Sequence, residues 1–346
     1  MEDSNLTMKD IGEFEFIRSI QRNCHYSPSK LIQGIGDDCA VIGPYEDRVF
    51  LITTDLLLED VHFILKKIPP EHIGEKAVNV NLSDIAAMGG DARHLFVSLA
   101  IPKQMRVETA RLIYTGIKTA CRVHNVNILG GDTSASPDRL MINVTVIGEA
   151  RKKEVLYRNG ARAGDGIYTT GTLGDSAAGL MLIMEEASAP KPLASVLIKA
   201  HNRPKPYLEA SRMIAQSRLA SAMIDLSDGL ASDLWRICES SRVGARLEQN
   251  ALPISEELKA VADLNHLDPL HLALSGGEDY RLLITVPQKN AVQFQKMFKR
   301  SDPCQIFCLG EITGDGGIET IAPNGSCKRL DFKGFDHFRA APVFAI

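Results

Sequence analysis

The sequence predicts a mixed α/β protein built from two domains. At 346 residues the chain is long for one compact core. Short segments with strand-like composition alternate with longer segments of helical periodicity. A charged, turn-prone stretch over residues 149–163 separates the two halves. We therefore expect an N-terminal domain at 1–150 and a C-terminal domain at 151–346.

The composition argues against several classes of partner. Hydrophobic residues make up 45% of the chain and charged residues 24%, which is ordinary for a globular protein. A net charge of −4 gives no general attraction to nucleic acid or to an anionic membrane. No apolar run approaches the roughly 20 residues of a bilayer span. The polar start and seven cysteines without a CxxC pair predict a cytoplasmic protein with reduced thiols.

The first half is expected to open with a helix near 13–20 and a β-hairpin. Strands are predicted at Cys39–Ile42 and Val49–Thr54, joined by turn-forming residues between them. In such a hairpin Asp38 falls opposite Thr53 or Thr54. Three carboxylates would then converge at one end of the sheet: Asp37, Asp38 and Asp55.

A helix beginning at Pro69–Pro70 and running to about Met88 follows the hairpin. At 100° per residue, one apolar stripe of this helix comprises Ile73, Ala77, Val80, Asp84 and Met88. Asp84 could be a capping or edge residue that Asn81 or Ser83 satisfies. An ionised carboxylate is rarely buried without a partner, however, so the pattern favours contact with a metal or ligand.

The remaining elements alternate in type. We expect helices over about 107–123, after Asp175–Ser176, over 204–216 and behind Ser227 as N-cap, with a loop at 185–192. Strands are expected at 127–129, 141–147, 166–170, 222–226 and 280–286.

Several aspartates stand in short phrases flanked by glycine or hydroxyl residues. The phrases are GIGDDCAVIG (34–43), TTD (53–55), NLSDIAAMGG (81–90), GGDT (130–133) and MIDLSDGL (223–230). Each alone matches a turn, because Asp and Gly are turn formers. Gathered together, two such charges about 4 Å apart would repel by about 4 kcal/mol at an effective dielectric of about 20. Hard oxygen ligands in that number predict Mg²⁺, which usually carries a phosphorylated substrate.

Familiar nucleotide-binding signatures are missing from the chain. There is no GxxxxGK[ST], no GxGxxG after a strand and no HRD…DFG set, and no grouping typical of a covalent nucleophile. His62 follows the TTD strand and is either structural or a substrate contact. Arg158 either binds phosphate or decorates the linker.

Taken in order, these phrases resemble the thiamine-monophosphate kinases of the AIR-synthase-related superfamily. The resemblance spans essentially the whole chain, and its more specific pieces are VHF after the TTD strand, GGEDY and the terminal KGFDHF. It implies a two-domain AIR-synthase-like fold, with an N-terminal domain that forms a barrel with a second subunit. It also implies Mg²⁺-dependent transfer of the ATP γ-phosphoryl to thiamine monophosphate by direct in-line attack.

The resemblance further implies a set of site residues. Metal ions would be held by Asp38, Thr53, Thr54, Asp55, Asp84, Asp132, Asp225 and Asp228. ATP would contact Tyr114, Gly131, Arg158 and Ser227, and the thiamine phosphate would meet His62, Glu278 and Phe335. Two alternatives stay open at this stage: another ATP-dependent enzyme of the same superfamily, or a non-catalytic nucleotide-binding protein that assists cofactor maturation.

Overall fold

The computed structural model describes residues 7–21, 24–301 and 304–330. Its helices are α1 (Met8–Ile20), α2 (Pro70–Ala87), α3 (Val107–His124), α4 (Asp175–Met184), α5 (Lys191–Asn202), α6 (Leu208–Ser217), α7 (Leu230–Ser241), α8 (Glu256–Asn265), α9 (Pro269–Ser275) and α10 (Ala291–Ser301). Its strands are β1 (Leu31–Gln33), β2 (Ala40–Tyr45), β3 (Arg48–Leu58), β4 (Asp91–Pro102), β5 (Asn127–Ser136), β6 (Met141–Arg151), β7 (Gly166–Thr170), β8 (Ala222–Asp225), β9 (Gly244–Glu248), β10 (Leu282–Val286), β11 (Ile306–Thr313), β12 (Gly317–Ile321) and β13 (Cys327–Arg329).

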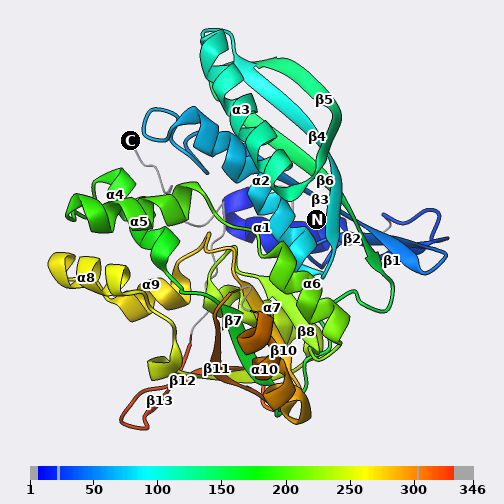
Figure 1. Ribbon diagram of the computed structural model, residues 1–346, viewed down its shortest axis with the longest axis vertical. Coiled ribbons are helices and arrows are strands. Elements are labelled where there is room, and N and C mark those ends of the chain that lie inside the picture. Colours follow the sequence, from blue (N-terminus) through cyan, green and yellow to red (C-terminus); the bar gives the residue numbers. More distant parts are fainter. Residues whose placement is uncertain (1–6, 22–23, 302–303, 331–346) are drawn as a thin grey trace.

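Two sheets organise the molecule, one in each half of the chain (Figure 1). The first has six strands in the order β1-β2-β3-β6-β4-β5. The second has seven strands in the order β13-β12-β9-β11-β7-β10-β8. This confirms the predicted mixed α/β class. No helix among the described residues is both long and apolar enough to cross a bilayer.

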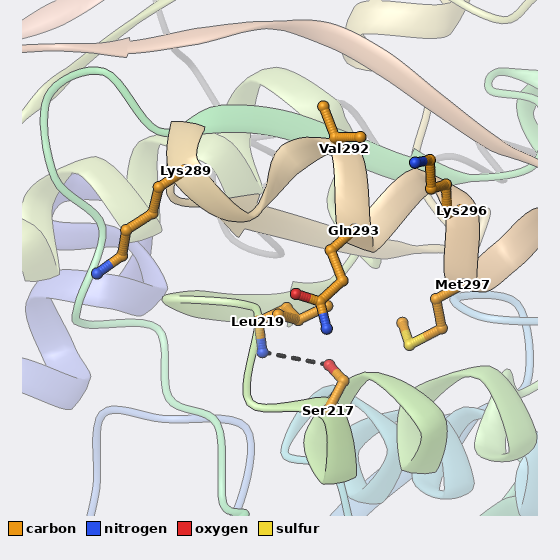
Figure 2. Close-up of a pocket in the computed structure, with 7 residues that line it drawn as sticks. All are labelled: Ser217, Leu219, Lys289, Val292, Gln293, Lys296 and Met297. Carbon is orange, nitrogen blue, oxygen red and sulfur yellow. Dashed lines mark hydrogen bonds between the residues drawn. The ribbon is translucent and has the colours of Figure 1, made fainter.

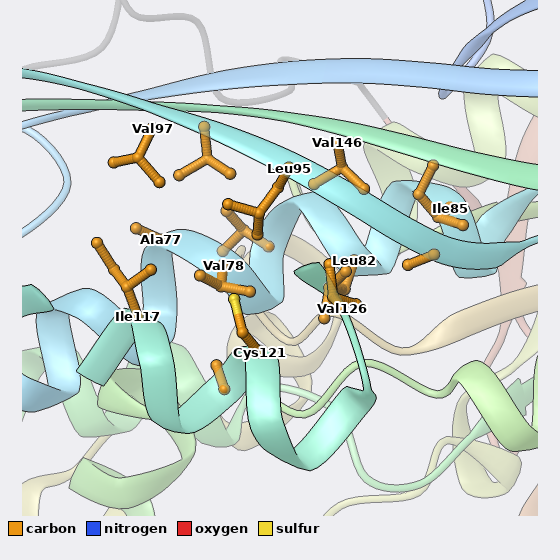
Figure 3. Packing of buried hydrophobic residues seen from close by; sticks show 14 of the residues in the cluster. Ala77, Val78, Leu82, Ile85, Leu95, Val97, Ile117, Cys121, Val126 and Val146 are labelled. Carbon is orange, nitrogen blue, oxygen red and sulfur yellow. The ribbon is translucent and has the colours of Figure 1, made fainter. Parts of the chain in front are cut away.

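Helix α2 is the element around which the site is built. Its apolar side packs under the first sheet together with α3. Figure 3 shows Ala77 and Ile85 on the side of the strands that carry Leu95 and Val146, and Leu82 beside Val126 just after the end of α3. The same helix also contacts α6 and β8 of the second half. Residues carried by α2 can therefore face both sheets at once.

The predicted hairpin is confirmed, and so is its register. Ala40 pairs with Ile52 and Val41 with Leu51, so continuing the antiparallel pairing places Asp38 opposite Thr54. Strand β2 extends beyond its predicted end to Tyr45. The predicted helices at 70–88 and 107–123 are confirmed as α2 and α3.

Other boundaries in the first half differ from the prediction. The first helix begins at Met8, although its backbone leaves helical geometry at Gly12. The strand predicted at 127–129 continues to Ser136 because it pairs in parallel with β4 along its whole length. Strand β4 itself is absent from the predictions above, even though Leu95, Val97 and Leu99 alternate as buried residues.

In the second half, the predicted N-cap at Ser227 is wrong. Helix α7 begins at Leu230, after Gly229 with φ of 107°. The carbonyl oxygens of residues 226 and 227 instead accept hydrogen bonds from the N–H groups of Tyr280 and Glu278 at 2.8 and 2.7 Å. Strand β10 accordingly begins at Leu282 rather than at residue 280, and α6 begins at Leu208 rather than at residue 204.

Candidate functional site

Three aspartates from three different elements meet where the two sheets face α2. Asp38 precedes β2, Asp84 lies in the last turn of α2, and Asp225 ends β8. One carboxylate oxygen from each lies within 4.8 Å of the other two. Asp38 and Asp225 are buried, with 8% and 2% of their surface exposed. The site thus joins residues 38, 84 and 225 across both halves of the chain.

Short hydrogen bonds from neutral side chains orient these carboxylates. Thr53 Oγ1 donates to Asp84 Oδ2 at 2.5 Å, and Ser83 Oγ donates to Asp225 Oδ2 at 2.6 Å. The backbone N–H of Asp55 donates to Asn81 Oδ1 at 3.0 Å. Neutral donors fix the direction of a carboxylate without neutralising its charge, so the aspartates keep their capacity to bind a cation.

Arg158 brings the positive charge at the edge of the cluster. Its Nη2 donates to Asp38 Oδ1 at 2.6 Å, and its Nε lies 3.9 Å from Asp37 Oδ1. The second oxygen of Asp38, Oδ2, is buried and accepts no hydrogen bond within the described structure. A single guanidinium therefore faces a larger number of carboxylates.

Burial and mutual repulsion shift the titration of these groups upward. Burial raises the pKa of Asp225 to about 8, and Asp38 adds to the effect while Ser83 and Arg158 oppose it. Burial followed by the Asp38 charge raises the pKa of Asp37 to about 7 and of Asp55 to about 6. Burial also raises the pKa of Asp84 well above its ordinary value, with Asp55 contributing next. All four shifts arise first from burial and then from the neighbouring carboxylates, whose charge is not fully compensated by nearby cations.

A divalent cation fits this donor set. The cluster offers several hard carboxylate oxygens, one of them the orphaned and buried Oδ2 of Asp38. Mg²⁺ prefers such oxygen ligands and usually keeps some of its waters while bridging to substrate phosphates. The arrangement can therefore hold a metal–polyphosphate complex. Binding of the metal would reduce the electrostatic repulsion between the carboxylates.

Asp228 follows Asp225 by three residues but has a different partner. Its Oδ2 accepts from Arg236 Nη2 at 2.5 Å, and its backbone N–H donates to Asp233 Oδ2 at 3.0 Å. The Arg236 guanidinium lies in turn over the ring of Phe14, 4.2 Å from its centroid. Because α7 starts at Leu230, Asp228 precedes the helix rather than occupying its start as predicted.

A second group of charged residues surrounds Glu278. Lys76 Nζ lies 2.9 Å from Glu278 Oε1, and His201 Nδ1 lies 3.3 Å from Glu278 Oε2. Lys76 also donates to the carbonyl oxygen of His62 at 3.4 Å. Burial works to raise the pKa of Glu278, but Lys76, followed by His201, holds it below its usual value. Here every charge has a partner.

Some predicted residues are not gathered at the cluster. In β3 the buried residues alternate, so Thr53 faces α2 while the Thr54 side chain points to the opposite face, where it contacts Thr145 at 3.0 Å. Asp132 pairs with Ser98 in the register of β5 and is exposed on that opposite face. Their roles remain predictions.

Two further nucleotide contacts and one substrate contact also remain predictions. Gly131 has a structural reason of its own, because a Cβ there would lie 1.6 Å from the Val97 carbonyl oxygen of β4. Tyr114 of α3 packs partly buried against the first core, with Lys118 Nζ 5.6 Å from its ring centroid. Phe335 lies outside the described residues.

Lys76 and His201 take part in the site region although sequence reasoning did not single them out. Lys76 has only 1% of its surface exposed. It lies three residues after Ile73 and four before Val80, so it falls on the same buried stripe as Asp84. A lysine on an apolar stripe was the available signal. His201 carries no comparable signal, because its contacts join elements far apart in sequence.

A pocket of about 570 Å³ lies elsewhere, between the end of α6 and α10 (Figure 2). Its lining includes Leu219 and Met297, with Lys289 and Lys296 also on it. None of the predicted site residues lines it, so it is separate from the acidic cluster.

Comparison with known proteins matches both halves of the chain. Residues 36–150 match the AIR synthase related protein, N-terminal domain, and residues 162–322 match the corresponding C-terminal domain. The thiamine-monophosphate kinase of Aquifex aeolicus (strain VF5) is 34% identical over 333 residues, which cover 96% of this chain and 100% of that protein. The structure of AaThiL complexed with AMPPCP and TMP is 33% identical with a TM-score of 0.83, covering 96% of this chain and 99% of that one.

A more distant structure shares the architecture alone. The hydrogenase maturation protein HypE of E. coli is 21% identical with a TM-score of 0.70, covering 85% of this chain and 87% of that one. At this identity the likeness speaks for the fold and carries no functional statement.

Proposed function

We propose, since this chain belongs to the thiamine-monophosphate kinase family of AIR synthase related proteins, that it transfers the γ-phosphoryl group of ATP to thiamine monophosphate. The products are thiamine diphosphate and ADP, which makes this the last step of thiamine diphosphate formation. The observation that carries the proposal is the convergence of Asp38, Asp84 and Asp225 within 4.8 Å, in a chain that matches these kinases over nearly its full length.

The metal is proposed to be Mg²⁺, present as several ions. The proposal rests on an all-oxygen donor set with one guanidinium and too little other positive charge. When bound, Mg²⁺ would neutralise phosphate charge and hold the triphosphate of ATP close to the single phosphate of the acceptor. The proposed ligands are Asp38, Thr53, Thr54, Asp55, Asp84, Asp132, Asp225 and Asp228.

The chain's own residues supply positioning rather than acid–base chemistry. The acceptor is a phosphate oxygen, already anionic near neutrality, so no strong general base is required to activate it. In the transfer, that oxygen bonds to the γ-phosphorus as the bond to the bridging oxygen breaks and ADP leaves. Arg158, a predicted ATP contact, is held by Asp38 at 2.6 Å and can present its remaining N–H groups to phosphate oxygens.

The two substrates, ATP and thiamine monophosphate, are assigned to two different sets of residues. ATP is proposed to contact Tyr114, Gly131, Arg158 and Ser227. Thiamine monophosphate is proposed to meet His62, Glu278 and Phe335, whose aromatic plane suits stacking on a cationic ring. His62 and Glu278 support this division because Lys76 contacts both of them.

We further propose a homodimer formed through the uncovered face of the first sheet. Helices α2 and α3 cover one face, whereas the other exposes three large apolar side chains: Phe50, Leu56 and Phe96. Such a patch is typical of a subunit interface. Thr54 and Asp132 lie on this face, so a second copy packed against it is how they would join a site. Light scattering coupled to size exclusion tests the proposal, since Leu56→Asp should give monomers.

Domain limits and location stay proposals of the same kind. We place the domain boundary at residues 150 and 151. We also propose a cytoplasmic location, on the sequence pattern of seven cysteines without a CxxC pair.

Product analysis tests the proposed function directly. The purified protein is incubated with MgCl₂, ATP and thiamine monophosphate, and the nucleotides and thiamine phosphates are separated by chromatography. Equal amounts of ADP and thiamine diphosphate are expected. If ADP never appears with both substrates present, the kinase proposal is wrong. A non-catalytic nucleotide-binding role is then the better-supported hypothesis.

A further inference from the structure

Lys76 is a lysine whose charged side chain is buried in the interior of the protein. Only 1% of its surface reaches solvent, and lysine is almost never so buried unless its charge is paired. Its Nζ meets Glu278 Oε1 at 2.9 Å, the His62 carbonyl oxygen at 3.4 Å and His201 Nε2 at 3.4 Å. Two of these three partners are the residues proposed to contact thiamine monophosphate.

The partners of Lys76 come from segments that are far apart in the chain. His62 follows β3 in the first half, Glu278 lies between α9 and β10, and His201 lies in the last turn of α5. Glu278 has a positive φ of 64°, which is unfavourable for a residue with a side chain. Its backbone N–H is held by the Ser227 carbonyl at 2.7 Å, so the ion pair with Lys76 completes its fixation.

The ammonium group also determines the state of His201. Lys76 has only donors, so the Nε2 atom of His201 must accept from it. The ring proton of neutral His201 then lies on Nδ1, which faces Glu278 Oε2 at 3.3 Å and Ser176 Oγ at 3.1 Å. Burial, followed by the Lys76 charge, lowers the pKa of His201 to about 4, so the ring is neutral at physiological pH. Lys76 is thus the one fixed positive charge among the residues seen to contact the Glu278 carboxylate.

We propose that Lys76 is a positioning residue for the part of the site that binds thiamine monophosphate. It fixes the backbone at His62, in the first half of the chain, relative to the Glu278 carboxylate in the second half. The inference rests on the proposed function and deepens it. With only 1% of its surface exposed, Lys76 has little surface to offer a substrate. It acts through the direction of the Glu278 carboxylate and the place of the His62 backbone.

The test is the variant Lys76→Met, which keeps the length of the side chain and removes its charge. The KM for thiamine monophosphate is expected to rise about 10- to 100-fold, the range for loss of a hydrogen bond between charged groups. The KM for ATP should change by less than about 3-fold, because the acidic cluster is untouched. Equal changes in both KM values would mean that Lys76 only supports packing, and would overturn the inference.

Arg203→Gln is the matched control. Arg203, the residue that follows α5 directly, pairs with Glu75 of α2 at 2.6 Å, so the variant breaks an ion pair that joins α2 to the end of α5, as the Lys76–His201 contact does. Its guanidinium is half-exposed and touches neither His62 nor Glu278. Both KM values should stay within about 2-fold of wild type. If Arg203→Gln reproduces the Lys76→Met effect, helix packing alone explains it.

A double variant keeps the test decisive if Lys76→Met fails to fold. In Lys76→Met/Glu278→Gln the pair is neutral and close to its original volume, so no buried charge is left alone. If Lys76 acts mainly through Glu278, the KM for thiamine monophosphate should rise in the double variant to the level expected for Lys76→Met, about 10- to 100-fold, while the KM for ATP stays within about 3-fold. A further rise of more than about 10-fold would refute that route. Failure of the proposed function would be seen separately, as a wild-type protein that makes no thiamine diphosphate.

Discussion

The two charged regions of the molecule are built on opposite principles. Around Asp38, Asp84 and Asp225, carboxylates outnumber cations, and four aspartates carry raised pKa values. Around Glu278, each charge has its partner, and the pKa of the carboxyl is lowered. The first region is electrostatically incomplete, whereas the second is complete.

The difference indicates which kind of ligand each region is suited to bind. A cluster that lacks positive charge gains most from a ligand that brings it, such as a metal–nucleotide complex. A region whose charges are already matched gains from shape and direction, as expected for an organic ring system that must be oriented. Each prediction below separates the two regions.

The largest effect is expected at the incomplete region. Asp55→Asn should lower kcat by at least about 1,000-fold, because removing one proposed metal ligand disrupts the electrostatic stabilisation of the transferring phosphoryl. The fold should persist, since the amide is isosteric. Steady-state turnover and circular dichroism check both parts. Retained activity would remove Asp55 from the proposed ligand set.

Stability in the absence of metal should fall as pH rises. The pKa values of Asp55, Asp37 and Asp225 are about 6, 7 and 8 in the folded protein, against 3.8 for the ordinary carboxyl. A raised folded pKa favours the protonated form, so its stabilisation is present below pH about 4 and is lost as pH passes through about 6 to 8. Thermal unfolding in EDTA should therefore give a falling Tm over this window.

Mg²⁺ should reverse that loss at the alkaline end. At a free concentration 100 times its Kd, a ligand specific for the folded state adds about 2.7 kcal/mol. The gain in Tm should be larger at pH 8 than at pH 5, because protons compete for the same oxygens. Asp225→Asn serves as the control and should reduce the slope. A Tm that rises with pH in EDTA would contradict the charge imbalance.

A smaller effect is expected on the thiamine side from Phe335→Ala. Loss of stacking on a cationic ring is worth about 2 kcal/mol when desolvated, or about 30-fold in affinity. The variant should weaken binding of thiamine monophosphate far more than binding of ATP, as measured by calorimetry with each ligand. Equal weakening of both would show that the terminal segment only packs.

The smallest effect is expected from Arg236→Gln. Its guanidinium pairs with Asp228 at 2.5 Å, and both side chains are about one-fifth exposed. If Asp228 binds metal, the guanidinium competes with the ion by about 1 kcal/mol, as partly exposed pairs do. Apparent activation by Mg²⁺ should tighten up to about 5-fold in the variant. If half-maximal activity needs the same or a higher Mg²⁺ concentration, Arg236 positions Asp228 instead of competing for it.

Much of this arrangement follows from local sequence pattern. The hairpin register could be read from its turn, and the stripe on α2 placed Asp84 on a buried face. The local pattern could not predict which elements distant in sequence contact one another. The Ser227 N-cap fails for this reason, since the carbonyls of residues 226 and 227 pair with the loop before β10. Lys76 shows the same limit, because its partners come from residues 62, 201 and 278.

Helix α2 carries one residue of each charged region on a single rigid rod. Asp84 lies eight residues beyond Lys76, which at about 1.5 Å per residue separates the two by about 12 Å along the axis. The helix thereby acts as a gauge of length. An acceptor whose phosphate lies much nearer to its ring, or much farther from it, would reach only one of the two charged regions. Discrimination among phosphorylated compounds would then depend on the spacing between two turns of one helix, beyond any single contact.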